Sequence, residues 1–203
     1  MGTKVLLGIV GAVVLIAIVL GLSVVSPYNT LVRLDQAAQA QWGQVENVYQ
    51  RRADLVPSLV ETVKGASNFE KDTLTAVTEA RAKVGQVTPG AMQNIVNDPA
   101  AFQRFQQAQD GLSSALSRLM VVAERYPELK ATQNFRDLQV QLEGTENRIT
   151  VERMRFNETA QAFNTQRESF PTVLIAGFFG ERFQPKAYFK AQTGAEKAPA
   201  VKF

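Results

Sequence analysis

The sequence predicts an all-α protein in which a membrane anchor precedes a helical bundle, and three observations support this. Residues 5–25 form an uncharged apolar run. Residues 28–64 carry apolar side chains at heptad spacing, and two later segments, residues 99–126 and 132–169, also carry apolar stripes. Stripes of this kind are typical of helices in bundles or coiled coils.

The composition excludes several classes of chemistry. The chain has no cysteine and no histidine, which removes disulfides, thiol nucleophiles, the usual zinc sites and Ser-His-Asp or Cys-His catalysis. A net charge of +3 on 203 residues is mild and does not indicate nucleic-acid binding. We therefore expect a protein that is not an enzyme and has no cofactor or metal site.

The apolar run predicts a transmembrane anchor at residues 1–26. Its 21 residues span roughly 30 Å as a helix, the thickness of a bilayer core. A cleaved signal peptide is the alternative, but its apolar region is about 7–15 residues and ends in small residues. Here Ser26 leads into Pro27, which favours a retained single-pass anchor in the bacterial cytoplasmic (inner) membrane.

The charges beside the run predict its orientation. Lys4 and the N-terminal amine flank one side, whereas Arg33 on the other side is offset by Asp35. Positive charge favours the cytoplasmic side, so the following bundle is expected outside that membrane, on the periplasmic side. Counted over the positive charges alone, the difference is a single charge, two against one.

Two pairs of small residues lie within the run, Gly8 with Ala12 and Ala17 with Gly21. Such pairs let membrane helices approach closely, although they are also ordinary membrane-helix composition. The pairs start nine residues apart, about two and a half helical turns, and so face opposite sides. This arrangement favours a homo-oligomer larger than a dimer.

The second predicted unit, residues 27–170, begins with a long helix for which Pro27 is suited to the first turn. Nine of the eleven heptad seam positions from residue 28 to residue 63 are apolar. The two exceptions, Asp35 and Arg52, place charges where the seam requires apolar side chains. A shorter apolar stripe follows at residues 69–85, and Asp98 before Pro99 predicts the start of another helix.

The last predicted unit, residues 171–203, loses this periodicity and is expected to be a non-helical, basic aromatic tail. Its apolar segment after Pro171 is too short to cross a bilayer as a helix. The tail holds five basic and two acidic residues, so its charge of +3 equals that of the whole chain.

Several motifs resemble the LemA family of bacterial membrane proteins, in the same order along the chain. They are RRADLVPSLVETVKG (residues 51–65), EARA (79–82), LEGTENRI (142–149), FNETAQAFN (156–164) and FPTVLIAGFFG (170–180). The resemblance implies a single N-terminal anchor followed by an up-and-down antiparallel four-helix bundle. It implies little about activity.

A first candidate site is a polar cluster between the first and the last long helix. If these helices are antiparallel, Arg52 falls near Thr145 or Glu146. An unpaired buried charge is very costly, so we expect a structural ion pair, and the alternative is a recognition site for an anionic group. The candidate residues are Arg51, Arg52, Asp54, Glu143, Glu146, Arg148 and Glu152.

A second candidate site is the tail, which either folds back over the bundle or contacts lipid headgroups or a partner. Its candidate contact residues are Phe178, Phe179, Arg182, Phe183, Lys186 and Lys190. Together these features predict a membrane-anchored, non-enzymatic scaffold or adaptor at the cell envelope that binds other envelope proteins. The alternative is a protein that organises or deforms the membrane through its tail.

Overall fold

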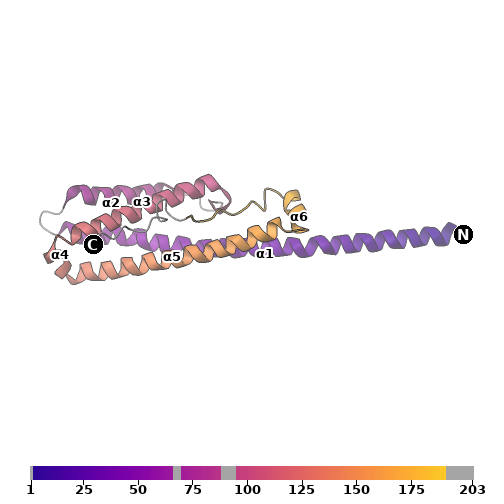
Figure 1. The fold of residues 1–203 in the computed structure, drawn as a ribbon, viewed down its shortest axis with the longest axis horizontal. Helices are drawn as coiled ribbons and strands as arrows, with labels where there is room; N and C mark the ends of the chain where they lie inside the picture. Colours follow the sequence, from indigo (N-terminus) through magenta and orange to yellow (C-terminus); the bar gives the residue numbers. More distant parts are fainter. Residues whose placement is uncertain (1, 66–69, 88–94, 191–203) are drawn as a thin grey trace, which may run out of the picture.

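The structure, a computed structural model, describes residues 2–65, 70–87 and 95–190, and within the first helix it leaves the side chains at positions 4, 5, 17, 20, 22 and 23 undescribed. All regular structure in these ranges is helical, so the predicted all-α class is confirmed. Four long helices, α1 (Gly2–Lys64), α2 (Lys71–Val87), α3 (Pro99–Ala123) and α5 (Gln133–Glu168), form the bundle (Figure 1).

The first helix, α1, is continuous through both the predicted anchor and the first bundle helix. It contains Pro27 and Pro57, so the prediction that Pro27 begins a new helix is wrong. Proline removes one intrahelical hydrogen bond, but the bonds on either side of it continue the helix. Figure 1 shows α1 extending well past the other helices at its N-terminal end.

The long helices are antiparallel in two pairs. Leu31 near the start of the bundle part of α1 shares a cluster with Phe163 near the end of α5, and Val63 shares another with Phe135 near the start of α5. The second pair is α2 with α3, where Glu70 before α2 forms a salt bridge with Arg125 after α3. α1 packs mainly on α5, and α2 mainly on α3.

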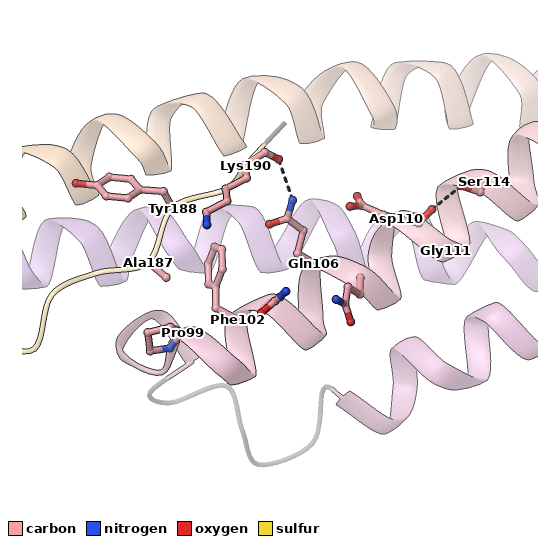
Figure 2. A pocket seen from close by; sticks show the side chains of 11 residues that line it. Pro99, Phe102, Gln106, Asp110, Gly111, Ser114, Ala187, Tyr188 and Lys190 are labelled. Carbon is pink, nitrogen blue, oxygen red and sulfur yellow. Dashed lines mark hydrogen bonds between the residues drawn. The ribbon is translucent and has the colours of Figure 1, made fainter. Parts of the chain in front are cut away.

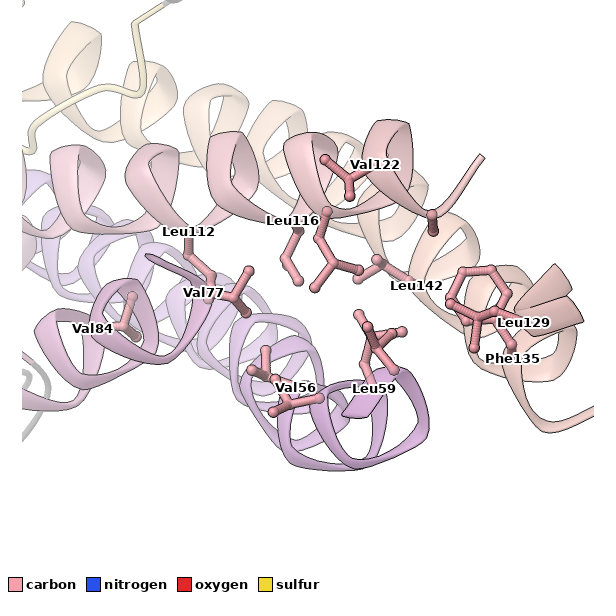
Figure 3. Packing of buried hydrophobic residues seen from close by; sticks show 14 residues of the cluster. Val56, Leu59, Val77, Val84, Leu112, Leu116, Val122, Leu129, Phe135 and Leu142 are labelled. Carbon is pink, nitrogen blue, oxygen red and sulfur yellow. The ribbon is translucent and has the colours of Figure 1, made fainter. Parts of the chain in front are cut away.

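Two large apolar clusters fill the bundle. At the end distant from the N-terminus, aliphatic residues of all four long helices meet around Leu59, Leu112 and Leu119 (Figure 3). Towards the middle, Trp42 packs on Phe102, Phe105 and Phe156 with ring centroids 5.2–5.6 Å apart. Burial of each phenylalanine contributes about 2–3 kcal/mol, so these aromatic contacts are a main source of stability.

The predicted helix starts agree with the capping chemistry. Asp98 Oδ1 accepts hydrogen bonds from the backbone N–H groups of Ala100 and Ala101, with Pro99 in the first turn. Thr132 caps α5 in the same way. Between α3 and α5 lies α4 (Pro127–Ala131), a single turn that the sequence pattern does not predict.

The predicted non-helical tail begins with a short helix, α6 (Thr172–Phe178), so that prediction is wrong for these residues. Thr172, Ile175 and Ala176 are buried against the end of α5 and the adjoining part of α1, which gives seven residues enough packing to stay helical. Residues 184–190 then run without regular structure along the bundle. Positions 191–203 of the predicted tail lie outside the described residues.

In the described ranges, no helix combines the length with the apolarity needed to cross a bilayer. The structure therefore does not support the transmembrane anchor predicted for residues 1–26. The apolar side chains that are described between Leu6 and Val25 are exposed.

Candidate functional site

Arg52 of α1 is a buried charge at the centre of a polar network, and its relative exposure is 1%. Its Nη1 donates to Glu146 Oε1 of α5 at 2.8 Å and to the Ser113 hydroxyl of α3. Its Nη2 donates to the carbonyl oxygen of Gln109 at 3.1 Å and to the side-chain oxygen of the same residue. One guanidinium thus connects three helices.

The aromatic ring of Tyr49 covers this guanidinium, with 5.0 Å between its centroid and Arg52 Cζ. The Tyr49 hydroxyl accepts a 2.6 Å hydrogen bond from Arg153 Nε, and Arg153 also pairs with Asp110 of α3 at 3.1 Å. Burial raises the pKa of Tyr49 despite the two neighbouring arginines, which lower it. At neutral pH the hydroxyl is therefore protonated, and it accepts from Arg153 while the Tyr49 ring faces Arg52.

Only part of the first predicted polar cluster comes together. Arg52 meets Glu146, as the antiparallel alignment predicts, and Glu152 instead accepts from Gln41 and pairs with Arg155. The remaining members lie on the bundle surface and do not join the Arg52 network. These are Arg51, Asp54, Glu143 and Arg148.

A second buried cation, Lys186, lies at the other end of the bundle. Its Nζ donates to Asp35 Oδ1 of α1 and, at 2.7 Å, to Asn97 Oδ1 of η1 (Ile95–Asn97), and it lies 4.7 Å from the centroid of the Phe163 ring. The sequence pattern did not lead us to predict this pair. Asp35, the second charge on the heptad seam, is the residue that indicates a buried cationic partner.

Two asparagines of α5 each form two hydrogen bonds with the backbone of one tail residue, and we call each such pair of bonds a clamp. Asn164 Nδ2 donates to the carbonyl oxygen of Lys186, and Asn164 Oδ1 accepts from the N–H of the same residue. Asn157 does the same with Phe189. Seven helical residues rise about 10.5 Å and three extended residues about 10 Å, so the two clamps are in register with an extended tail antiparallel to α5.

The packing of the tail on the bundle determines which of its predicted contact residues are exposed to solvent. Phe183 and Lys186 are buried in the bundle, so they cannot serve as the predicted membrane or partner contacts. Phe178, Phe179, Arg182 and Lys190 are exposed. The described tail therefore covers the bundle along residues 183–190 and presents candidate contacts only at its two ends.

A groove runs beside the tail, between it and α3 (Figure 2). It has a volume of about 730 Å³. Gln106 at its edge donates to the carbonyl oxygen of Lys190 at 2.8 Å, and Figure 2 shows the tail lying between α3 and α5. The other polar lining residues include Gln103, Gln107, Asp110 and Ser114.

A second groove of about 610 Å³ lies further along α3, between α3 and α5. α3 contributes Ser113, Ser117 and Met120, and α5 contributes Glu143 and Asn147. Both grooves are rich in amide and hydroxyl groups, which can donate to and accept from a peptide backbone. No group of three or more potential metal ligands occurs in residues 2–65, 70–87 and 95–190.

Comparison with known families identifies the chain. Residues 41–203, well over half of it, match the LemA family. The chain belongs to the LemA family. The resemblance carried by the five sequence motifs is therefore confirmed, and these LemA-family motifs supply Arg52, Glu146, Asn157 and Asn164.

Several curated relatives are similar to this LemA-family chain. Magnetosome protein MamQ 1 of Paramagnetospirillum magneticum is 24% identical over 183 residues, which are 83% of the chain and 66% of the relative. Magnetosome protein MamQ of Magnetospirillum gryphiswaldense is 26% identical over 168 residues, 74% of the chain and 62% of the relative. Protein LemA of Metamycoplasma hominis is 24% identical over 148 residues, which are 73% of the chain and 63% of the relative.

The chain thus spans slightly less than two thirds of the length of these relatives. The printed names describe three of the similar proteins as magnetosome proteins and state no reaction for any of the four.

Removal of the Arg52 side chain is expected to destabilise the bundle. Arg52→Ala leaves Gln109 and Ser113 without their buried partner and should lower the free energy of unfolding by about 3 kcal/mol. Arg52→Met should cost less, because it refills the aliphatic volume. Thermal unfolding of the full chain in mild detergent measures both.

The matched control is Arg51→Ala, which removes the same side chain from the adjacent exposed position and should change the free energy of unfolding little. An unchanged melting temperature for Arg52→Ala would contradict the role assigned to this guanidinium.

Glu46 provides a pH-dependent test. Burial raises the pKa of Glu46 above its ordinary value of 4.5, although the hydrogen bond from Trp42 Nε1 lowers it. A raised pKa in the folded state means that the protein loses stability as Glu46 ionises, starting near pH 4.5. Glu46→Gln should therefore gain stability at pH 7 relative to the parent chain, and this gain should shrink at pH 4.

Unfolding of both proteins at the two pH values measures this difference, with Glu79→Gln on the exposed face of α2 as the control. A gain from Glu46→Gln that is equal at pH 4 and pH 7 would be incompatible with the raised pKa.

Proposed function

We propose that this LemA-family protein is a membrane-anchored, non-enzymatic scaffold or adaptor of the bacterial cell envelope. The observation that carries the proposal is the continuity of α1, a single helix from Gly2 to Lys64. Its N-terminal part includes the uncharged run at residues 5–25, and its C-terminal part supplies the core of the bundle. Insertion of the run into a bilayer would hold the bundle in a fixed position beside it.

The anchor is proposed from the sequence run and its length. The single excess charge at Lys4 favours a bundle outside the cytoplasmic membrane. Gly8 and Gly21 have no atom within 4 Å of the position of an added Cβ, so both remain open to close approach by a second copy. The homo-oligomer expected from these positions is part of the proposal.

The adaptor role is supported by two grooves, one between α3 and the tail and one between α3 and α5. Gln106, which lines the first groove, and Asn157 of α5 already hold one extended backbone, that of the tail. The other amide and hydroxyl side chains that line the grooves, such as Gln103, Gln107 and Ser117, suit an extended segment of another envelope protein. The Arg52 and Lys186 pairs stabilise the helices that line these grooves.

The alternative function is a protein that organises lipid through its whole basic aromatic tail. It has less support, because Phe183 and Lys186 are buried and Phe189 is packed among the core aromatics. Only the two ends of the described tail remain free for such contacts.

Photo-crosslinking in membranes tests the proposal. Full-length protein carrying a photoreactive residue at Gln107, in the first groove, is compared with protein carrying it at Val140, which is exposed on α5 outside both grooves. The protein should stay in membranes washed at alkaline pH. Irradiation should then give a discrete adduct from position 107 and none from position 140.

An adduct whose mass is a multiple of the chain mass indicates a second copy, and any other discrete mass indicates a different protein. Release by the alkaline wash, or equal labelling at the two positions, would contradict the proposal.

A further inference from the structure

Five apolar side chains form an exposed surface at the end of the bundle from which α1 extends. We call this surface the α6 patch, and it consists of Phe170, Val173, Leu174, Phe178 and Phe179. Phe170, Leu174 and Phe178 are 81%, 66% and 84% exposed. Leu174 and Phe178 are four residues apart in α6 and so share one side of the helix, and Phe170 lies in the turn just before it. Large apolar side chains clustered in this way indicate an interaction surface.

The patch is fixed to the bundle on its other side. Thr172, Ile175 and Ala176 are buried, and Gln166 Nε2 of α5 donates to the Thr172 hydroxyl at 2.9 Å. The Phe179 ring lies 5.1 Å from that of Tyr28 on α1. The exposed side chains are therefore presented by a packed element.

The contact with Tyr28 places the patch relative to the apolar run. Tyr28 is three residues beyond Val25, the last residue of the run, and three helical residues rise about 4.5 Å. Figure 1 shows α6 beside α1 where α1 leaves the other helices. If the run fills the bilayer core, α6 lies at the boundary between acyl chains and headgroups, where aromatic side chains are favoured.

The charges near the patch decide the kind of contact. Arg182 lies over the Tyr28 ring, with 5.5 Å from Cζ to the centroid, and Arg167 is nearby because it donates to the carbonyl oxygen of Phe183. Glu168 and Glu181, both exposed, have the opposite charge and flank the same element. Because these charges balance, the contact depends on apolar burial rather than on attraction to anionic lipid.

We propose that the α6 patch inserts into the interfacial layer of the same bilayer that holds α1, as a second point of membrane contact. This inference rests on the proposed anchor. Two contacts on different helices restrict the tilt of the bundle relative to the membrane, which a single helix does not do.

Depth-dependent quenching tests the inference, and the absence of native cysteine allows single labels. Full-length protein carries one fluorophore at Phe178→Cys, Leu174→Cys, Val14→Cys or Val140→Cys and is reconstituted into phosphatidylcholine vesicles. In separate samples, some of the lipid bears a nitroxide either high on the acyl chain or near its end. We expect several-fold quenching at positions 174 and 178 by the shallow nitroxide, several-fold quenching at position 14 by the deep one, and none at position 140, on α5, by either.

The outcomes separate the two proposals. Quenching at position 14 without quenching at positions 174 and 178 overturns the patch inference and leaves the anchor intact. Absence of quenching at position 14 overturns the anchor and, with it, the inference. In protein labelled at position 178, Phe170→Ser with Leu174→Ser should reduce the quenching at least twofold while quenching at position 14 persists in the matched protein. Unchanged quenching at position 178 in that variant would contradict an apolar contact.

Discussion

Two buried cations determine how α1 lies against the rest of the bundle. Arg52 joins α1 to α3 and α5 through Gln109, Ser113 and Glu146. Lys186 joins α1 to η1 and the tail through Asp35 and Asn97. Because Arg52 and Lys186 are both buried, an alignment of the helices that separated them from these partners would leave a buried charge without compensation. The two pairs therefore favour the observed register.

The tail depends on that register. Asn157 and Asn164 are one heptad apart on α5, and they clamp residues three apart in the tail. The hydrogen bonds from Asn164 hold Lys186 between α1 and η1. The tail also covers the side of the bundle between α3 and α5 (Figure 2). The grooves beside the tail and the exposed α6 patch are the surfaces that remain after this closure. The grooves suit a segment of a partner protein, and the α6 patch suits contact with lipid. For this reason we propose an adaptor that is held close to a membrane.

Much of the helical fold follows from the sequence pattern. The seam from Leu31 to Val63 is buried as predicted, Asp98 begins α3, and Arg52 faces Glu146 because antiparallel helices of similar length leave little choice of alignment. Of the two alternatives predicted for the tail, residues 183–190 follow the one in which it folds back over the bundle. The details of this packing could not be predicted, because they depend on side-chain amides that bond to a backbone with no periodicity of its own. Lys186 resembled an exposed basic residue until its partner Asp35 was known. The continuity of α1 through Pro27 was also missed, since proline is equally suited to a first helical turn.

The central claim is that α1 is one uninterrupted helix, so that the proposed anchor fixes the position of the bundle relative to the membrane. A distance measurement between spin labels at Gly11→Cys and Ala37→Cys tests it most directly. Both positions are exposed, Pro27 lies between them, and the chain has no other cysteine. In reconstituted vesicles, a continuous helix predicts one narrow distribution centred near 39 Å, from about 1.5 Å per residue. A broad distribution, or a second population at clearly shorter distance, would show that α1 bends or breaks and would contradict this account.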